Sequence, residues 1–406
     1  MRILAVYRHF WPDSPPYASM LRTIAGALAA DGHEVSVLAE RPSYKAVDRA
    51  ARAPGREVLD GVRVRRLARL PAMRRSAVRR LGAAVFPLRV VGYAIRERLR
   101  GRRYDVLWTA TMPPAINGAG ARLAARILGA RFVYHLQDIY PELQTFSGKW
   151  RETGTLARIT GWLDARNVHL AACNVTLSDD MATTIQARGV PADRVRVIAN
   201  IMPDSFDEET PLEPALAKLP GRFRVIFAGN VGRFQGLEAL VEAARLLRDE
   251  RPEVEFLVLG EGAMLGALRE AAADLPNIRF EGHRPLREAK PVIATADAGL
   301  VSIQPGIYRA AYPSKTVTYL GLGVPLLAVV EPESELARSI VEGRLGWVAP
   351  SGDGEGLAAA VRAAWAARDE VPAMRERARA AFEREFAQAA VLERWRALMR
   401  ELEPSG

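Results

Sequence analysis

The chain contains a single cysteine, Cys173, so neither a disulfide framework nor a metal site built from several cysteines is available to it. It also has no run of about 18 apolar residues, and the longest candidate, Leu81–Ile95, is interrupted by Pro87 and Arg89, so no transmembrane helix is expected. The apolar run at the N-terminus is too short for a signal peptide. These absences favour a cytoplasmic protein.

Acidic residues are scarce in one part of the chain. Between Gly61 and Arg103 there are fourteen arginines and one acid, Glu97, so this segment carries +13 against +10 for the whole chain. Apolar residues alternate with the cations across residues 63–103, the arginine belt, which suits a helix lying on the anionic inner face of the plasma membrane. Nucleic acid is the rival partner and is disfavoured, because no recognised nucleic-acid motif accompanies the arginines. A solvated, arginine-rich helix pair is the third interpretation.

Strand and helix patterns alternate along most of the 406 residues, which predicts an α/β fold with parallel, doubly wound sheets. The alternation breaks at residues 200–222, which are rich in Pro, Asp and Glu and read as a linker. We therefore predict an N-terminal Rossmann-like domain over residues 1–202, a second one over 203–385, and a terminal helix over 386–406 that packs back on the first domain. Strands are expected at Arg2–Tyr7, His33–Ala39, Val62–Leu67, Tyr104–Thr109, Arg131–His135, Asn174–Leu177 and Arg194–Ile198, and then at Arg224–Ala228, Glu255–Gly260, Ile278–Glu281, Ala298–Ser302, Pro325–Val330 and Gly346–Val348.

A glycine-rich turn opens the second domain. The apolar run Val225–Ala228 leads into Gly229-Asn230-Val231-Gly232-Arg233-Phe234-Gln235-Gly236, and a helical pattern follows. Glycines allow close backbone approach and helix N-termini favour anions, so this loop is a candidate phosphate site. Its spacing differs from the dinucleotide fingerprint G-x-G-x-x-G, which argues against NAD or FAD. An ordinary strand-to-helix turn is the alternative.

Ligands of open α/β sheets bind at the carboxyl ends of strands, so a ligand is expected in a cleft between the two domains. Besides the loop at 229–236, four segments follow strand ends and carry polar groups: Gly260-Glu261-Gly262, Gly282-His283-Arg284-Pro285-Leu286, Tyr312-Pro313-Ser314-Lys315-Thr316-Val317-Thr318, and His135-Leu136-Gln137-Asp138.

With these segments in view, the chain resembles the family-4 retaining glycosyltransferases, which have the GT-B fold, and within them the polysaccharide-biosynthesis branch with a Pro-Ser-Lys motif. The resemblance covers nearly the whole chain. It rests on Gly32-His33-Glu34-Val35, Gln137-Asp138-Ile139-Tyr140-Pro141-Glu142, the loop at 229–236, Pro313-Ser314-Lys315, Gly323-Val324-Pro325-Leu326-Leu327 and Gly346-Trp347-Val348-Ala349-Pro350.

The resemblance implies a nucleotide-sugar donor, a UDP-sugar rather than a GDP-sugar, and a glycan or lipid-linked acceptor. It implies catalytic roles for His135, Arg233 and Lys315, of which the two cations would bind the donor diphosphate. The donor-binding residues it implies are Gly229, Asn230, Gly232, Arg233, Gly262, His283, Arg284, Pro313, Ser314, Lys315, Thr318 and Glu335. On the acceptor side it favours Asp13, Tyr17 and Asp138. No cofactor is expected, because the family's front-face mechanism lets the leaving phosphate accept the acceptor's proton.

Two departures from the family pattern bear on these roles. Many members have a glutamate at each of the positions of Ala310 and Thr318, and cations at the positions of Asn230 and Gln235. The missing glutamates keep a non-catalytic, membrane-associated transferase subunit open as an alternative, beside a nucleotide-sugar epimerase on the same scaffold.

No metal site is expected. Asp179-Asp180 is placed to cap a helix beginning near Ser178, and Asp207-Glu208-Glu209 lies in the linker.

Overall fold

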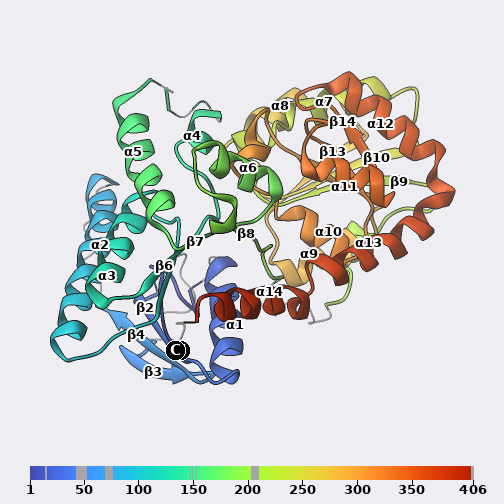
Figure 1. Cartoon of the computed structure of the whole chain (residues 1–406). Coiled ribbons are helices and arrows are strands. Elements are labelled where there is room, and N and C mark those ends of the chain that lie inside the picture. Colours follow the sequence, from blue (N-terminus) through green and yellow to red (C-terminus); the bar gives the residue numbers. More distant parts are fainter. Residues whose placement is uncertain are drawn as a thin grey trace. The chain divides into compact units, whose positions relative to one another are not determined.

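A computed structural model of the chain describes residues 1–13, 16–42, 53–68, 76–146, 148, 150–151, 153–202 and 210–403, without the side chains of 16 and 76–84. The chain forms two compact units, Met1–Pro203 with Gln388–Gly406, and Asp204–Ala387. We call them unit 1 and unit 2 and describe each by itself (Figure 1). None of the helices in the described ranges is long and apolar enough to cross a membrane. The acids Asp207, Glu208 and Glu209 lie outside the described residues.

Unit 1 is built on an eight-stranded sheet in the order β3-β4-β2-β1-β5-β6-β7-β8. All neighbours are parallel except β3 and β4, which pair antiparallel. The strands are β1 (Arg2–Val6), β2 (Glu34–Glu40), β3 (Arg56–Leu59), β4 (Val62–Leu67), β5 (Val106–Ala110), β6 (Arg131–His135), β7 (Cys173–Thr176) and β8 (Val195–Val197). The helices are α1 (Pro16–Ala30), α2 (Ser76–Leu99), α3 (Ile116–Leu128), α4 (Glu142–Phe146), α5 (Thr155–Leu170), α6 (Asp179–Ala187) and α14 (Gln388–Glu401).

One strand of unit 1, β3, is missing from the strands that the sequence predicts. β3 reads Arg-Glu-Val-Leu, with too few apolar residues to signal a strand. It forms because Asp60 and Gly61, both with positive φ, turn the chain tightly back into β4. Helix α1 begins at Pro16, since proline is well suited to a first helical turn.

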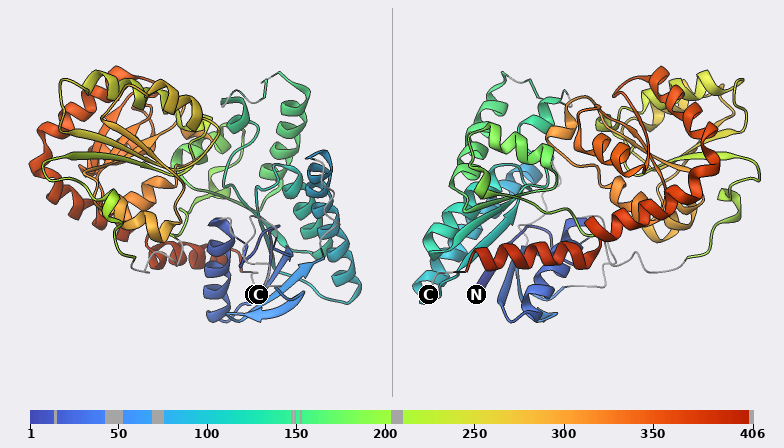
Figure 2. Two further views of the ribbon diagram at one scale, coloured as in Figure 1. Left: turned by 180° about the vertical axis from the view of Figure 1, so that it is seen from behind. Right: turned by 45° about the vertical axis from the view of Figure 1, so that its right-hand side comes forward.

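The last helix of the chain belongs to the core of unit 1. Trp395, Val391 and Met399 of α14 are fully buried with residues of α1, β1, β2 and β5. The Trp395 ring lies 4.5 Å from the Trp108 ring of β5. Figures 1 and 2 show α14 running beside α1. The C-terminal segment therefore packs back on the N-terminal domain, and it follows α13 (Val371–Glu385) as the second of two helices.

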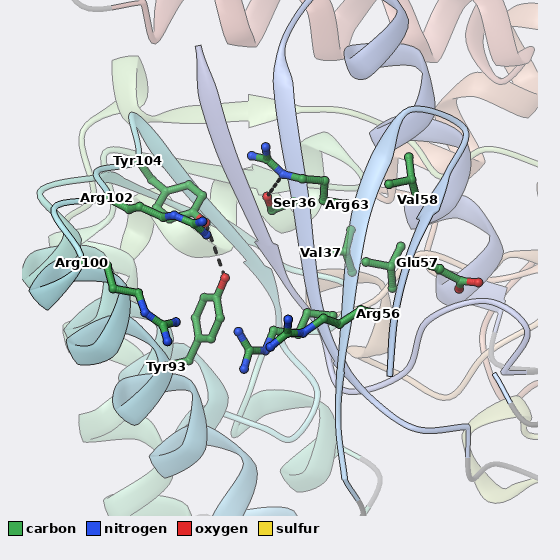
Figure 3. A pocket seen from close by; sticks show the side chains of 12 residues that line it. Ser36, Val37, Arg56, Glu57, Val58, Arg63, Tyr93, Arg100, Arg102 and Tyr104 are labelled. Atoms are coloured by element: carbon green, nitrogen blue, oxygen red, sulfur yellow. Dashed lines mark hydrogen bonds between the residues drawn. The ribbon is translucent and has the colours of Figure 1, made fainter. Parts of the chain in front are cut away.

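The opposite face of the same sheet carries α2, α3 and α5 (Figure 2). Helix α2 holds the C-terminal part of the arginine belt, and its apolar residues Phe86 and Val90 are buried in the unit rather than presented outward. It approaches α3 so closely that a Cβ on Gly120 would lie 2.6 Å from Pro87 Cβ. Residues 69–75 of the belt lie outside the described residues. Arg63 of β4 and Arg56 of β3 lie at the edge of the sheet and line a hollow there (Figure 3).

Unit 2 contains a six-stranded, fully parallel sheet in the order β11-β10-β9-β12-β13-β14. Its strands are β9 (Phe223–Ala228), β10 (Val254–Leu259), β11 (Ile278–Glu281), β12 (Ala298–Ser302), β13 (Leu326–Val329) and β14 (Gly346–Ala349). Its α-helices are α7 (Glu238–Leu247), α8 (Leu265–Ala271), α9 (Leu286–Ala294), α10 (Lys315–Gly321), α11 (Glu335–Gly343), α12 (Gly354–Ala366) and α13. Residues of α7, α8 and α12 share one apolar core with β9 and β10. Both units thus have the doubly wound architecture that the alternation predicts.

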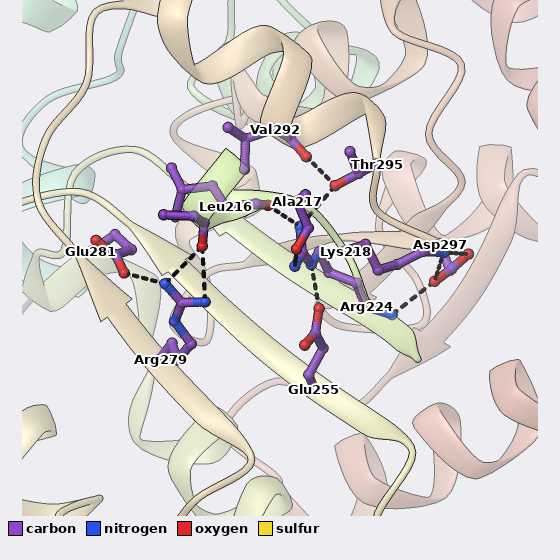
Figure 4. Close-up of polar contacts among 11 residues, drawn as sticks. Leu216, Ala217, Lys218, Arg224, Glu255, Arg279, Glu281, Val292, Thr295 and Asp297 are labelled. Carbon is purple, nitrogen blue, oxygen red and sulfur yellow. Dashed lines mark hydrogen bonds and ion pairs between the residues drawn. The ribbon is translucent and has the colours of Figure 1, made fainter. Parts of the chain in front are cut away.

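A buried arginine fixes the segment that leads into unit 2 (Figure 4). Arg224, at the start of β9, is 2% exposed, pairs with Glu255, and donates to the backbone oxygens of Leu216 and Ala217 at 2.7 and 3.1 Å. Lys218, next in that segment, pairs with Asp297 at 2.8 Å. The part of the expected linker after residue 210 is therefore anchored to the sheet by ion pairs and backbone hydrogen bonds.

Candidate active site

The glycine loop at 229–236 follows the central strand β9 at its carboxyl end. Its first half is held to the turn after β10, since the Gly229 and Val231 amides donate to Leu259 O and Glu261 O at 2.8 and 2.9 Å. The two turns are so close that a Cβ on Gly260 would lie 1.8 Å from Gly229 O, and one on Gly262 would lie 2.2 Å from Val231 O. Glycine is required at 260 and 262 because the backbone of the loop occupies the space of a side chain.

Lys315 lies directly against this loop. A Cβ on Gly229 would lie 2.8 Å from Lys315 Cε and 3.2 Å from its Nζ, and Gly229 has φ 137°. The ammonium stands 4.6 Å from the centre of the Phe227 ring. No hydrogen bond or ion pair joins it to any residue that the structure describes. Protein atoms crowd the ammonium even though part of the side chain remains accessible, and this loss of hydration lowers the pKa of Lys315 to about 8. An unpaired, poorly hydrated cation beside a glycine turn is an environment suited to an anion.

Some of the other polar side chains of the loop are available to a ligand, and others are already hydrogen-bonded within the protein. Arg233 and Asn230 are exposed, and Arg233 has no partner within the described ranges. Gln235 is occupied, because its Oε1 accepts from the Gly232 amide at 3.0 Å and its backbone oxygen accepts from Ser302 Oγ at 2.5 Å. Of the two uncharged positions where cations are expected in the family, Gln235 thus stabilises the loop itself.

Tyr319 is a residue that the sequence does not single out. Its ring fills the space beside Gly299, where a Cβ would lie 2.5 Å from the ring. Its hydroxyl accepts from the Ala228 amide at 2.9 Å and donates to Ile226 O at 3.4 Å. Because Ala228 precedes the glycine loop, Tyr319 fixes the end of β9 that positions the loop. Its place four residues after Lys315, one helical turn further along α10, is the only local signal.

The remaining predicted donor residues occupy the same edge of the unit 2 sheet. Pro313 and Ser314 precede α10, and Thr318 lies on it, half-buried. Glu335 is the first residue of α11, whose N-cap is Ser334. Ala310, at one of the two positions where the family pattern has a glutamate, is completely buried.

Two predicted donor residues follow the outermost strand. His283 is exposed after β11, whereas Arg284 forms an ion pair with Glu213 at 2.7 Å. Strand β11 is separated from β9 by β10, so these residues are further along the edge than Lys315.

In unit 1, two predicted residues meet. His135 ends β6 and is 1% exposed, and its Nδ1 lies 3.0 Å from Tyr17 Oη. Its Nε2 lies 2.9 Å from the Gln137 amide, which also bonds Asn200. Burial lowers the pKa of His135 to about 3, so the ring is neutral and both its nitrogens are occupied. The imidazole is therefore a fixed polar group rather than a proton carrier at neutral pH.

Two carboxyl groups of unit 1 have distinct surroundings. Asp13 is buried and lies 2.7 Å from His9 Nδ1, so it is already engaged. Asp138 follows β6, and burial raises its pKa to about 6, with the Tyr140 hydroxyl 3.5 Å away. The charge of Asp138, one of the residues predicted on the acceptor side, therefore changes close to neutral pH.

The described residues contain no group of three or more His, Cys, Asp or Glu side chains that could hold a metal ion. Ser178 is the N-cap of α6, with Oγ accepting from the Met181 amide at 3.2 Å, and Asp179 and Asp180 form its first turn.

The overall architecture is that of the GT-B glycosyltransferases. The crystal structure of Anabaena Alr3699/HepE in complex with UDP aligns with 99% of this chain and 100% of its own, with a TM-score of 0.69 and 17% identity. The sucrose-phosphate synthase of Thermosynechococcus elongatus aligns with 99% of both chains, with a TM-score of 0.73 and 17% identity. At such identities the likeness establishes the fold.

Sequence comparison identifies the family. Residues 17–200 match the glycosyl transferase 4-like domain, and residues 222–367 match the glycosyl transferases group 1 domain. The chain therefore belongs to the group 1 glycosyltransferases with a glycosyl transferase 4-like N-terminal domain.

Two curated relatives are named as glycosyltransferases, and one of them is named for amylovoran biosynthesis. The probable glycosyltransferase WbjE of Pseudomonas aeruginosa is 27% identical over 66% of this chain and 67% of its own. The amylovoran biosynthesis glycosyltransferase AmsK of Erwinia amylovora is 29% identical over 50% of this chain and 49% of its own. The aligned segments thus span between about half and two thirds of these relatives.

Proposed function

We propose that the chain is a retaining glycosyltransferase of polysaccharide synthesis that moves a sugar from a UDP-sugar to a hydroxyl of a lipid-linked or other membrane-proximal glycan. The observation that carries the donor assignment is the unpaired ammonium of Lys315 against Gly229, described above. The UDP complex of HepE supports UDP as the nucleotide, and AmsK supports the polysaccharide acceptor class.

In this mechanism unit 2 holds the donor diphosphate. Lys315 and Arg233 supply positive charge, and the Asn230 amide of the loop, which has no partner among the described residues, supplies a hydrogen bond. As the bond from the sugar to the diphosphate breaks, negative charge builds on the leaving phosphate, so the same groups stabilise the transition state more than the ground state. The leaving phosphate accepts the proton of the attacking hydroxyl on the same face, which retains the anomeric configuration and requires neither a metal ion nor a general base.

Donor binding is tested by calorimetric titration with UDP, GDP and dTDP and then with their sugars. Lys315→Met and Arg233→Gln should each weaken UDP binding by about tenfold or more, the usual worth of a hydrogen bond to a charged group. Arg287→Gln, an exposed arginine of α9, is the charge-matched control. UDP binding that none of the three variants changes would remove the basis of the donor assignment.

Two finer parts of the proposal need their own measurements. NMR of the product gives the anomeric configuration of the new bond, and an inverted configuration would rule out the front-face mechanism. Transfer assayed with excess EDTA tests metal independence, and loss of transfer that Mg²⁺ or Mn²⁺ restores would contradict it.

A membrane-proximal acceptor is supported by the outer surface of α2, α3 and α5. Exposed apolar residues recur at helical spacing there, with Leu88, Ile95 and Leu99 on α2 and Ile159, Trp162 and Leu170 on α5. Arg158 and Arg166 flank those of α5, and Arg166 lies 4.5 Å over the Trp162 ring. Within the described residues of the three helices the acids are Glu97 and Asp164, and both are buried. Apolar and cationic groups without exposed acids favour an anionic lipid surface.

Flotation with vesicles of phosphatidylglycerol and of phosphatidylcholine tests this surface. The pair Ile159→Ser and Trp162→Ser should release the chain from anionic vesicles, whereas Val341→Ser, which removes an exposed apolar side chain from α11 of unit 2, should not. Equal flotation of both variants and the wild type would rule out this face.

A non-catalytic partner subunit is the second candidate, because Ala310 and Thr318 stand where the family pattern has glutamates. Transfer of sugar by the purified chain alone decides against it.

A further inference from the structure

Besides the cations at the glycine loop of unit 2, the chain has a cationic site in unit 1. It lies away from the strand ends that carry His135 and Asp138. A hollow of about 540 Å³ opens beside the edge strands β3 and β4, within the range of ordinary ligand pockets. Its lining includes Arg56, Arg63, Arg65, Arg100 and Arg102, together with two tyrosines (Figure 3). Ser36 and Arg63 lie near the starts of β2 and β4, and Arg102 precedes β5, so the hollow faces the amino-terminal half of the sheet.

Three of these arginines are paired and two are not. Glu97 pairs with Arg100 and Arg102 at 3.3 and 2.9 Å. Glu34 likewise pairs with Arg63. The side chains of Arg56 and Arg65 have neither a hydrogen bond nor an ion pair with any residue in the described part of the chain, although their backbones pair across β3 and β4. The one carboxylate that lines the hollow, Glu57, is bound to the buried Arg66.

Two guanidinium groups, those of Arg65 and Arg96, lie beside the Tyr93 ring. Arg65 lies 5.2 Å and Arg96 5.7 Å from the centre of the Tyr93 ring. Burial, and then repulsion from Arg96 and Arg56, lowers the pKa of Arg65, and the opposite influence of Tyr93 and Glu97 offsets only part of this shift. Like charges held close together destabilise the folded chain, and an anion that enters the hollow relieves this repulsion.

We propose that this hollow is a binding site for a phosphate or diphosphate group, held by the guanidinium groups of Arg65, which lies over the Tyr93 ring, and of Arg56, which lines the same hollow. Planar guanidinium groups bind phosphate oxygens in pairs, which suits arginine better than lysine for this role. The site is independent of the proposed donor site, since it lies in unit 1 and shares no residue with the glycine loop. The phosphate belongs either to a lipid headgroup or to a soluble molecule.

Two probes distinguish these sources. Inorganic pyrophosphate is titrated calorimetrically into the full chain at low ionic strength, and phosphatidylglycerol vesicles, with phosphatidylcholine vesicles as the blank, are used for sedimentation. Arg65→Gln and Arg56→Gln are compared with Arg287→Gln, which removes the same charge from unit 2. A pyrophosphate site elsewhere in the chain contributes equally to all three variants and cancels from the comparison.

We expect Arg65→Gln and Arg56→Gln each to weaken binding of at least one probe by about tenfold or more, with no such loss for Arg287→Gln. Loss for pyrophosphate identifies a site open to soluble phosphates, and loss for vesicles alone identifies a lipid headgroup. Arg65→Lys should recover only part of the affinity, because lysine restores the charge but not the paired N–H donors of a guanidinium group. Arg56 is exposed, so its variant tests the site even if Arg65→Gln unfolds. Equal binding by all variants, or no binding of either probe by the wild type, overturns the proposal.

Discussion

Replacing Lys315 by methionine should stabilise the unliganded protein while it weakens UDP binding. The pKa of the lysine falls from 10.5 to about 8, which corresponds to about 3 kcal/mol of native-state destabilisation at 1.36 kcal/mol per pH unit. Methionine keeps an unbranched stem against the Phe227 ring and removes the charge. Since water still reaches part of the side chain, we expect the free energy of unfolding of unit 2 to rise by about 1–3 kcal/mol below pH 8.

The pH dependence gives this prediction its sign. The folded-state pKa of about 8 lies below the unfolded value of 10.5, so between these pH values the unfolded chain binds more protons than the native chain. The penalty is therefore fully present below about pH 8 and is lost as the pH rises toward about 10.5. The stability difference between Lys315→Met and the wild type should shrink over this interval.

Urea unfolding followed by hydrogen exchange in peptides of unit 2 reports on the correct unit. Lys218→Met is the matched control, because it makes the same chemical change at a lysine paired with Asp297 at 2.8 Å and should lower stability instead. In parallel, Lys315→Met should lose about tenfold to a hundredfold in UDP affinity. A variant that is less stable than the wild type at pH 7 and binds UDP equally well would refute the reasoning on both counts.

Three further predictions concern two other residues of unit 2 and one residue of unit 1. Gly229→Ala places a methyl group 2.8 Å from the lysine Cε at φ 137°, so it should lower both thermal stability and UDP affinity, whereas Gly266→Ala, with no atom within 4 Å of the new Cβ, should lower neither. Tyr319→Phe leaves the Ala228 amide without its acceptor, at a cost of about 1–3 kcal/mol in urea unfolding; unchanged stability would show that water replaces the hydroxyl. Burial raises the pKa of Asp138 to about 6, so native stability should fall as pH rises through about 4 to 6, by up to about 3 kcal/mol, and Asp138→Asn should remove this fall in melting curves recorded against pH.

The architecture could be predicted from the sequence because its signals are local. Apolar runs such as Val225–Ala228, separated by helical patterns, define parallel strands without knowledge of the fold. Strand β3 has no such signal, because its four residues alternate between exposed and half-buried and depend on the turn at Asp60 and Gly61. Phe86 and Val90 are buried because α2 packs against α3. The composition of the arginine belt cannot reveal this packing, so it suggests that α2 exposes more of its apolar residues than it does.

The sequence indicates some residues of the candidate site and gives no sign of the contacts of others. Motif spacing brings Lys315 into consideration, and the structure places it against Gly229, 86 residues earlier in the chain. No local pattern indicates that Tyr319 hydrogen-bonds to Ala228, because that contact depends on how α10 packs on the sheet. Nor does the sequence indicate that Gln235 satisfies the loop rather than a ligand. Long-range packing decides which polar residues remain available.

Two of the poorly exposed cations of unit 2 illustrate this difference. Arg224 has Glu255 and two backbone carbonyls as partners, so its charge is compensated within the fold. Lys315 has no such partner among the described residues, although its pKa shows that the surroundings disfavour its charge. A cation that the fold itself needed would be expected to resemble Arg224. Under the proposed function, a bound anion offsets the cost of keeping Lys315 charged, so this residue would serve a ligand rather than stability.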